Sequence, residues 1–148
     1  MPALRHVVVD SSVVLKWVLP EAGRSKALAL LDEYEAGQTD LIAPGLLMEE
    51  CASALSTRCR RGDLTKADAR VAFRLLELRQ PVLVDEPAQL RASFELSVLH
   101  HLSFWDSIYL ALAIDKRCDI VTADRRFRTR SGNHYPFVTL LGEEPARR

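Results

Sequence analysis

The sequence contains no hydrophobic run long enough to cross a membrane and no excess of charge of either sign. A membrane-spanning helix needs about 20 consecutive apolar residues, and the apolar runs here are shorter. The formal net charge is zero, from 20 basic and 20 acidic residues, so binding to nucleic acid would need a local basic patch. The first apolar segment is interrupted by Asp10 and Lys16 and lacks a cleavage site, unlike a signal peptide. We therefore expect a soluble cytoplasmic protein that does not bind a membrane.

Cysteine is also scarce. The chain has three cysteines, Cys51, Cys59 and Cys118, with no Cys-x-x-Cys pair, and its four histidines show no metal-binding spacing. An odd number of isolated cysteines argues against a disulfide framework. We expect all three to be reduced thiols, and two of them, Cys51 and Cys118, to lie in the core because each falls within an apolar pattern.

What the chain does contain is an alternation of short apolar runs and amphipathic stretches. The apolar runs predict buried parallel strands at Arg5–Asp10, Leu41–Ala43, Val82–Val84, Ile120–Thr122 and Phe137–Leu140. Helical patterns lie between them, which predicts an α/β fold with a central, mostly parallel sheet of about four or five strands. The length of 148 residues suits one domain, which we place at residues 1–142, with a loose polar tail at 143–148.

Two of the helical stretches carry apolar stripes that we expect to face the core. The stripes consist of Val71, Leu75 and Leu78 in the first helix and Leu90, Phe94 and Val98 in the second. Two hydroxyl residues are placed to begin helices, because each is followed three residues later by an aspartate: Thr65 and Ser103.

Two aspartates end predicted strands. Asp10 follows the first strand and Asp124 follows the run Ile120–Thr122. In an open parallel sheet, ligands bind beyond the carboxyl ends of the strands. If these two strands are neighbours, both carboxylates lie at the same end of the sheet.

Two further acids lie on apolar helical faces. Glu50 falls on the stripe that contains Leu47, Cys51 and Ala54, whereas the preceding Glu49 points about 100° away from it. Asp106 lies in the first turn of the almost wholly apolar stretch "FWDSIYLALAI". These positions place ionisable groups where burial would cost several kcal/mol unless they are paired or bind metal.

Each acid taken singly has a structural alternative. Asp10 and Asp124 could be helix N-caps, Asp106 could complete a capping box with Ser103, and Glu50 could extend to the edge of its stripe. Taken together, a divalent cation shared by all four explains them better, because no Lys or Arg in the apolar stretches is spaced to pair with all of them. Carboxylate oxygens are the ligands that Mg²⁺ and Mn²⁺ prefer.

A carboxylate-bound divalent cation is suited to phosphodiester hydrolysis, because it activates water and stabilises charge on the leaving oxygen. Hydroxyls beside the acids are candidates for orienting carboxylates or water, with helix capping as the alternative role: Ser11, Ser12, Ser53 and Thr122. A phosphatase that forms an aspartyl phosphate is a weaker alternative, because it would need Asp-x-Asp where this chain has "DSS".

Four segments together resemble the PIN-domain nucleases, and within them the VapC-type toxins of prokaryotic toxin–antitoxin pairs. The segments are "VVVDSSVVLKWVLPE", "APGLLMEECASAL", "LSFWDSIYLALA" and "IVTADRRF", which contain Asp10, Glu50, Asp106 and Asp124 in the family's order. The match runs from about residue 6 to 128. One departure is visible, since many relatives have Asn three residues after the Glu, where this chain has Ser53.

The resemblance implies an α/β/α sandwich and a Mg²⁺- or Mn²⁺-dependent endoribonuclease with the four acids as catalytic and metal-binding residues. It also implies a homodimer and a cognate VapB-type antitoxin that blocks the active-site groove. Arginines directly after Asp124 are candidates for binding the RNA backbone: Arg125, Arg126 and Arg128. A PIN-like module that binds RNA or protein without cutting it is the alternative.

Overall fold

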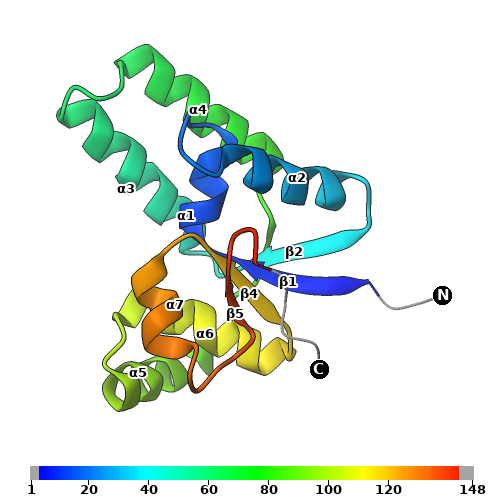
Figure 1. Ribbon diagram of the computed structural model, residues 1–148. Helices are drawn as coiled ribbons and strands as arrows, with labels where there is room; N and C mark the ends of the chain where they lie inside the picture. The colour runs from blue at the N-terminus through cyan, green and yellow to red at the C-terminus, as the bar shows by residue number, and fades with distance from the viewer. Residues whose placement is uncertain (1–3, 144–148) are drawn as a thin grey trace.

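Five parallel strands form the centre of the computed structural model, which describes residues 4–143 (Figure 1). The strands are β1 (Arg5–Val9), β2 (Thr39–Ala43), β3 (Val82–Leu83), β4 (Asp119–Thr122) and β5 (Val138–Leu140). Their order across the sheet is β3-β2-β1-β4-β5, and every neighbouring pair is parallel. The predicted fold class is therefore confirmed. Residues 144–148 of the predicted tail lie outside the described residues.

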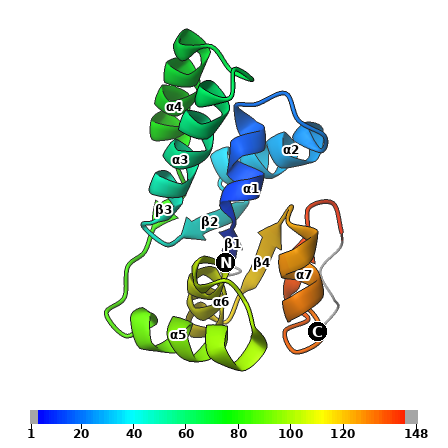
Figure 2. The same cartoon turned by 90° about the vertical axis from the view of Figure 1, so that its left-hand side faces the viewer.

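Helices cover both faces of the sheet (Figures 1 and 2). Above it in Figure 1 lie α1 (Ser11–Val14), the 3₁₀ turn η1 (Leu15–Trp17), α2 (Arg24–Glu35), α3 (Leu47–Arg60) and α4 (Lys66–Arg79). Below it lie α5 (Gln89–His100), α6 (Phe104–Lys116) and α7 (Arg125–Ser131). Among residues 4–143, no helix combines the length and hydropathy needed to cross a bilayer.

The chain reverses its direction of winding between β1 and β4. From β1 the sheet grows outward through β2 and β3, and the chain then returns to add β4 and β5 on the other side of β1. In doubly wound sheets, ligands bind in the crevice where the order reverses, beyond the carboxyl ends of the two central strands. This crevice is the place where Asp10 and Asp124 follow their strands.

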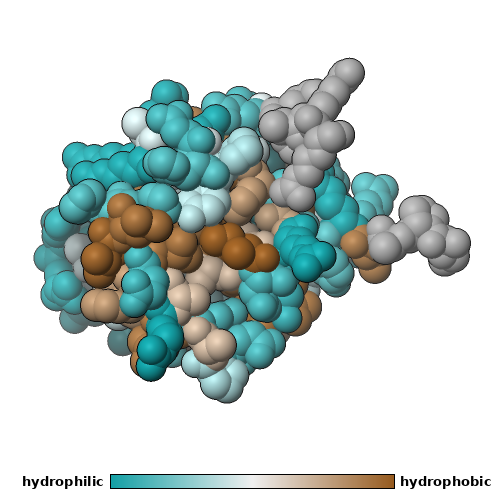
Figure 3. All heavy atoms as spheres, turned by 90° about the horizontal axis from the view of Figure 1, so that it is seen from below, coloured by the Kyte–Doolittle hydropathy of each residue, from teal (hydrophilic) through white to brown (hydrophobic). Residues whose placement is uncertain are grey.

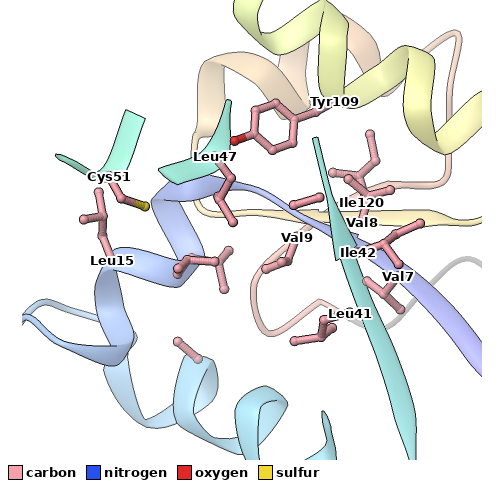
Figure 4. Close-up of a cluster of buried hydrophobic side chains, with 14 of the residues drawn as sticks. Val7, Val8, Val9, Leu15, Leu41, Ile42, Leu47, Cys51, Tyr109 and Ile120 are labelled. Carbon is pink, nitrogen blue, oxygen red and sulfur yellow. The ribbon is translucent and has the colours of Figure 1, made fainter. Parts of the chain in front are cut away.

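The core is built on the three central strands. Val7, Val8 and Val9 are fully buried, as expected for a strand covered on both faces (Figure 4). Leu41 of β2 and Ile120 of β4 pack beside them. The predicted caps are also confirmed, because the Asp68 and Asp106 N–H groups each donate a hydrogen bond of 3.0 Å to the hydroxyl three residues earlier. Cys51 and Cys118 are buried, as predicted.

The predicted inward face of α4 is wrong. Val71, Leu75 and Leu78 are exposed, with Leu78 at 75% exposure, whereas Ala72 and Leu76 are buried. The packed face is shifted by one residue, or about 100° around the helix. The reason is that α4 packs against α3 in an outlying hairpin, and not directly on the sheet.

The apolar stripe of α5 likewise faces outward. Leu90, Phe94 and Val98 are exposed, and the buried residues of this helix are Gln89 and Ser93. The Ser93 hydroxyl donates a hydrogen bond to the Gln89 carbonyl, so this small polar side chain is satisfied within its own helix. A small side chain lets α5 lie close to α6, which leaves its large apolar residues on the outer surface.

Candidate functional site

Asp10 lies at the centre of the crevice beyond β1. Its backbone N–H donates to the Val121 carbonyl at 3.1 Å, which continues the β1–β4 pairing, and its side chain is only 5% exposed. One carboxylate oxygen, Oδ2, accepts hydrogen bonds from Ser12 Oγ at 2.7 Å and Thr122 Oγ1 at 2.8 Å. The side chain makes no capping bond to α1, so capping does not explain this acid.

Ser12 and Thr122 connect the ends of the two strands. Ser12 Oγ accepts a hydrogen bond from the Ala123 N–H at 2.9 Å, and Thr122 Oγ1 accepts one from the Asp124 N–H at 3.0 Å. Each hydroxyl therefore uses its own proton for Asp10 and its lone pairs for the β4–α7 turn. These two residues hold the Asp10 carboxylate in one orientation.

Asp124 begins α7. Its Oδ1 accepts hydrogen bonds from the N–H groups of Arg126 at 2.8 Å and Phe127 at 3.4 Å, so the capping interpretation is correct for this residue. Its charge nevertheless raises the pKa values of Asp10 and Asp106, which places it beside them. Capping fixes the orientation of a carboxylate that also faces the crevice.

Glu50 and Asp106 approach the same crevice from helices on opposite faces of the sheet. Glu50 lies in the first turn of α3 and is half-buried, whereas Glu49 is exposed. Tyr109 Oη donates a hydrogen bond of 2.6 Å to Glu50 Oε1 across the gap between α6 and α3. Figure 4 shows the Tyr109 hydroxyl directed at the start of α3, beside Leu47.

The acids raise one another's pKa values. Burial raises the pKa of Asp10, opposed by its hydrogen bonds from Ser12 and Thr122. Burial raises the pKa of Glu50 to about 7; the Tyr109 bond lowers it, and the charges of Asp10 and Asp106 raise it further. The pKa of Asp106 rises to about 6 through burial and then the charge of Asp10.

No cation within the described residues neutralises this cluster by direct pairing. None of the salt bridges among residues 4–143 involves Asp10, Glu50, Asp106 or Asp124. Arg130 is near enough for its charge to lower the pKa of Asp106, but it forms no salt bridge with it. Four carboxylates that repel one another and lack a cation form a site of strongly negative potential.

The donor set fits a hard divalent cation. Among residues 4–143, no three His, Cys, Asp or Glu side chains are already arranged as a metal-binding group. Mg²⁺ does not require such a cage, because it usually keeps several waters and binds one or two carboxylates together with substrate phosphate oxygens. Asp10, with one oxygen held by two hydroxyls, is the most fixed of the candidate ligands.

A hollow of about 540 Å³ opens beside the acids, between α3 and the start of α6. Its lining includes the catalytic candidate Glu50 and two of the predicted hydroxyl residues, Ser11 and Ser53. Ser11 also contributes a backbone hydrogen bond that lowers the pKa of Asp10. Ser53, by contrast, is exposed, so it faces the hollow and not the buried carboxylate.

The three candidate RNA-binding arginines point in different directions. Arg125 lines a second hollow of about 310 Å³ together with Lys16 and Ala123. Arg126 is exposed. Arg128 lies 3.5 Å from Glu143, to which it forms a salt bridge, so its charge is already partly matched.

Three residues of the site are absent from the sequence-based candidates: Tyr109, Trp105 and Arg130. Tyr109 lies one turn after Asp106, and a hydroxyl on the same side of an apolar helix as a site acid is the signal that could have found it. Trp105 lines the 540 Å³ hollow. Arg130 lies in the same arginine cluster as the three candidates, and the sequence offers no means of ranking the four.

Comparison with protein-family models matches residues 7–133 to the PIN domain. No curated protein sequence matches the chain. Among solved structures, PAE2754 from Pyrobaculum aerophilum superposes with a TM-score of 0.66 and 23% identity, covering 86% of this chain and 87% of the other.

Two further structures share the fold. VapC20 from Mycobacterium tuberculosis, described as a sarcin–ricin loop cleaving toxin, has a TM-score of 0.62 and 20% identity, over 83% of this chain and 93% of its own. VapBC2 from Rickettsia felis, solved bound to a DNA fragment from its promoter, superposes with a TM-score of 0.64 and 12% sequence identity. The match covers 91% of this chain and 96% of the other. At these identities the likeness establishes the architecture.

Proposed function

This chain belongs to the PIN-domain family, and from that premise we propose that it is a metal-dependent endoribonuclease, the toxin of a type II toxin–antitoxin pair. One observation carries the proposal. Four carboxylates from four separate elements meet at the switch point of the sheet and repel one another, with no salt bridge to any described cation. A site built only for stability would pair or omit such charges.

In this proposal, some side chains of the site bind the cation and others orient those ligands. Asp10, held by Ser12 and Thr122, is the fixed ligand, and Asp106 and Glu50 extend toward it from α6 and α3. Asp124, held by the first turn of α7, adds a further carboxylate on the β4 side. When bound, Mg²⁺ or Mn²⁺ would lower the pKa of a water and stabilise charge on the leaving oxygen.

RNA is the proposed substrate, and the arginines that follow Asp124 supply positive charge next to a negative site. Arg125, which directly follows Asp124 and lines a hollow with Lys16, is the proposed contact to a backbone phosphate. Arg126 is exposed on the same short helix. Arg128 is the weakest of the three for this role, because Glu143 shares its charge.

A VapB-type antitoxin is the proposed protein partner, and the likeness to VapC20 and VapBC2 supports it. A groove of about 580 Å³ between α3 and α4 offers a place for an antitoxin segment. The groove combines apolar residues, among them Phe73 and Leu78, with two arginines, Arg70 and Arg74, and one acid, Glu77, so it suits a segment with apolar side chains and an excess of acidic ones.

A second copy of the chain is the other proposed partner. Figure 3 views the side on which α5 lies and shows apolar side chains gathered there. The outward stripe of α5, which consists of Leu90, Phe94 and Val98, is exposed, and so is the neighbouring Leu99. A homodimer would cover this surface, since large exposed apolar patches mark protein interfaces. We place the protein in the cytoplasm, where its RNA substrate lies.

Sequencing of RNA ends after brief expression tests the function. Wild-type protein should generate new 5′ ends at a restricted set of sites and arrest growth, whereas Asp10→Asn should do neither. Asp115→Asn is the matched control, because Asp115 is an exposed acid at the other end of α6, and it should behave like wild type. RNA that is bound but never cut in the presence of Mn²⁺ would instead identify a non-catalytic binding module.

A further inference from the structure

We propose that the hollow between α3 and the start of α6 is a nucleobase subsite, in which Trp105 stacks on the base next to the cleaved phosphate. The proposal deepens the function argued above, because it names how the same site binds its substrate. It starts from the position of the hollow. Glu50 lines both the hollow and the acid cluster, so whatever fills the hollow lies beside the bond that is cut.

Trp105 is presented as a stacking surface. It is 57% exposed although it lies in the first turn of a helix whose middle, including Tyr109–Ala113, is buried. Phe104 packs edge-on against it, with the ring centroids 5.6 Å apart and the rings inclined by 69°. The other tryptophan, Trp17, is buried and donates its indole N–H to the Ala27 carbonyl, as a core tryptophan usually does. Trp105 is therefore exposed and braced, as a base-stacking platform requires.

The remaining walls of the hollow favour a base over a phosphate. Leu15, Leu46 and Ala54 supply apolar contact, and no Lys or Arg among the described residues lines it. Its charged groups are Glu49 and Glu50, which would repel a phosphate. A nucleobase is neutral and flat, with aromatic faces and N–H donors at its edge, so it matches both the apolar walls and the acidic groups of the hollow.

Glu49 gives the subsite a means of selection. It lies one helical turn before Ser53 on α3, and both residues line the same hollow as Trp105. A carboxylate accepts hydrogen bonds from the exocyclic amino groups of adenine and cytosine, whereas the single imino N–H of uracil lies between two carbonyl oxygens that a carboxylate repels, so Glu49 favours bases with an exocyclic amino group. Glu49 thereby has a role distinct from that of Glu50, its neighbour in the sequence.

Tryptophan fluorescence provides a direct test, because Trp17 is buried and Trp105 reports on the hollow. The probes are single-stranded RNA pentamers of adenine, cytosine or uracil, titrated in Mg²⁺ against full-length Asp10→Asn protein, which should not cut them. The emission of Trp105 should be quenched, more strongly by the adenine and cytosine pentamers. In the same background, Trp105→Ala should bind about 10-fold more weakly by fluorescence anisotropy of labelled RNA, and Trp105→Phe should retain most of the affinity.

Ile114→Ala is the matched control, because it also removes an exposed apolar side chain from α6 but lies far along the helix from the hollow. It should bind RNA like the parent protein. In the active protein, Trp105→Ala should flatten the nucleotide preference at one position beside the cut in a random-sequence RNA pool. Glu49→Gln should reduce the preference for amino-bearing bases at that same position.

The outcomes separate this subsite from the proposed nuclease function. Equal RNA affinity and equal cleavage preference in Trp105→Ala and wild type would refute the subsite and leave the nuclease standing. RNA binding that depends on Trp105, with no cleavage by wild-type protein, would support the subsite and refute the nuclease. Loss of antitoxin binding in Trp105→Ala, with RNA binding unchanged, would show that the hollow holds a peptide and would overturn the proposal.

Discussion

Tyr109 illustrates how a single hydroxyl can connect the core to the site. Its ring is fully buried among core residues, whereas its Oη reaches Glu50 at 2.6 Å. Tyr109→Phe keeps the ring and removes only this hydrogen bond. Since groups that orient metal ligands typically contribute 10- to 100-fold in affinity, we expect Mn²⁺ binding to weaken by roughly 10-fold or more. Isothermal titration calorimetry measures this directly.

Tyr135→Phe is the control for that experiment. Tyr135 is also partly buried, and its hydroxyl lies 3.0 Å from His100 Nε2, away from the carboxylates. It should leave Mn²⁺ affinity unchanged. If the two variants bound Mn²⁺ equally well, the hydroxyl of Tyr109 would have no role in orienting Glu50.

Asp106 and Ser103 allow capping and catalysis to be separated. The Ser103 hydroxyl caps α6 by accepting from the Asp106 backbone N–H, which does not require the Asp106 carboxylate. Asp106→Asn should therefore fold normally and lose RNA cleavage. Ser103→Ala should lose about 1 kcal/mol of unfolding free energy and retain cleavage. Urea denaturation and a gel-based cleavage assay measure the two effects; a reversed pattern would make Asp106 a structural residue.

The sequence predicts the placement of acids much better than the placement of their partners. The rule that strand ends share one edge predicts that Asp10 and Asp124 meet, and the angular step of a helix distinguishes Glu50 from Glu49. These rules do not predict the hydrogen bond from Tyr109 to Glu50, because the two residues are 59 positions apart. An isolated tyrosine in an apolar helix also has the pattern of a core residue. Helical periodicity places Tyr109 on the same side of α6 as Asp106, but it does not identify Glu50 as the partner of its hydroxyl.

At the scale of elements, the exposed apolar stripe of α5 leads to a testable prediction about dimer formation. Its outward stripe includes Phe94, which is 56% exposed. If a second copy covers this stripe, Phe94→Asp should convert a dimer to a monomer, because burying an unpaired carboxylate is costly. Size-exclusion chromatography with light scattering measures the mass. Val71→Asp places the same charge on the exposed face of α4 and should leave the dimer intact.

The faces of α4 and α5 show where periodicity fails. Both helices carry an apolar stripe with the correct spacing, and in both it faces solvent. Periodicity identifies a helix and its apolar face, but it does not show whether another part of the chain covers that face. For α5 the inner face is instead formed by Gln89 and the small Ser93, because α6 packs closely against this side of the helix.

At the scale of the whole molecule, the cluster predicts an unusual dependence of stability on pH. The pKa values of Glu50 and Asp106 rise to about 7 and about 6 on folding, so between pH 4 and 7 the folded state binds more protons than the unfolded state. Stability must then fall as pH rises through this range. In EDTA, the melting temperature should be lower at pH 8 than at pH 5, by differential scanning fluorimetry.

Divalent cations should reverse this trend. Bound cation neutralises the repulsion, and a ligand at about 100 times its Kd adds about 2.7 kcal/mol to the stability of the folded state. Mg²⁺ or Mn²⁺ should therefore raise the melting temperature at pH 8 much more than at pH 5, where protons compete for the carboxylates. An equal rise in Asp10→Asn protein would show that the cation binds elsewhere.

The β1–β4 pairing determines when the enzyme can become active during its own synthesis. Asp10 leaves the ribosome well before the Thr122 hydroxyl that holds it, which lies 112 positions later in the chain, and before the acid at Asp124. Until β4 docks beside β1, the central strand lacks one edge partner and the crevice does not exist. A nascent chain that lacks β4 therefore cannot assemble the site, and a nonsense codon before β4 should yield an inactive product.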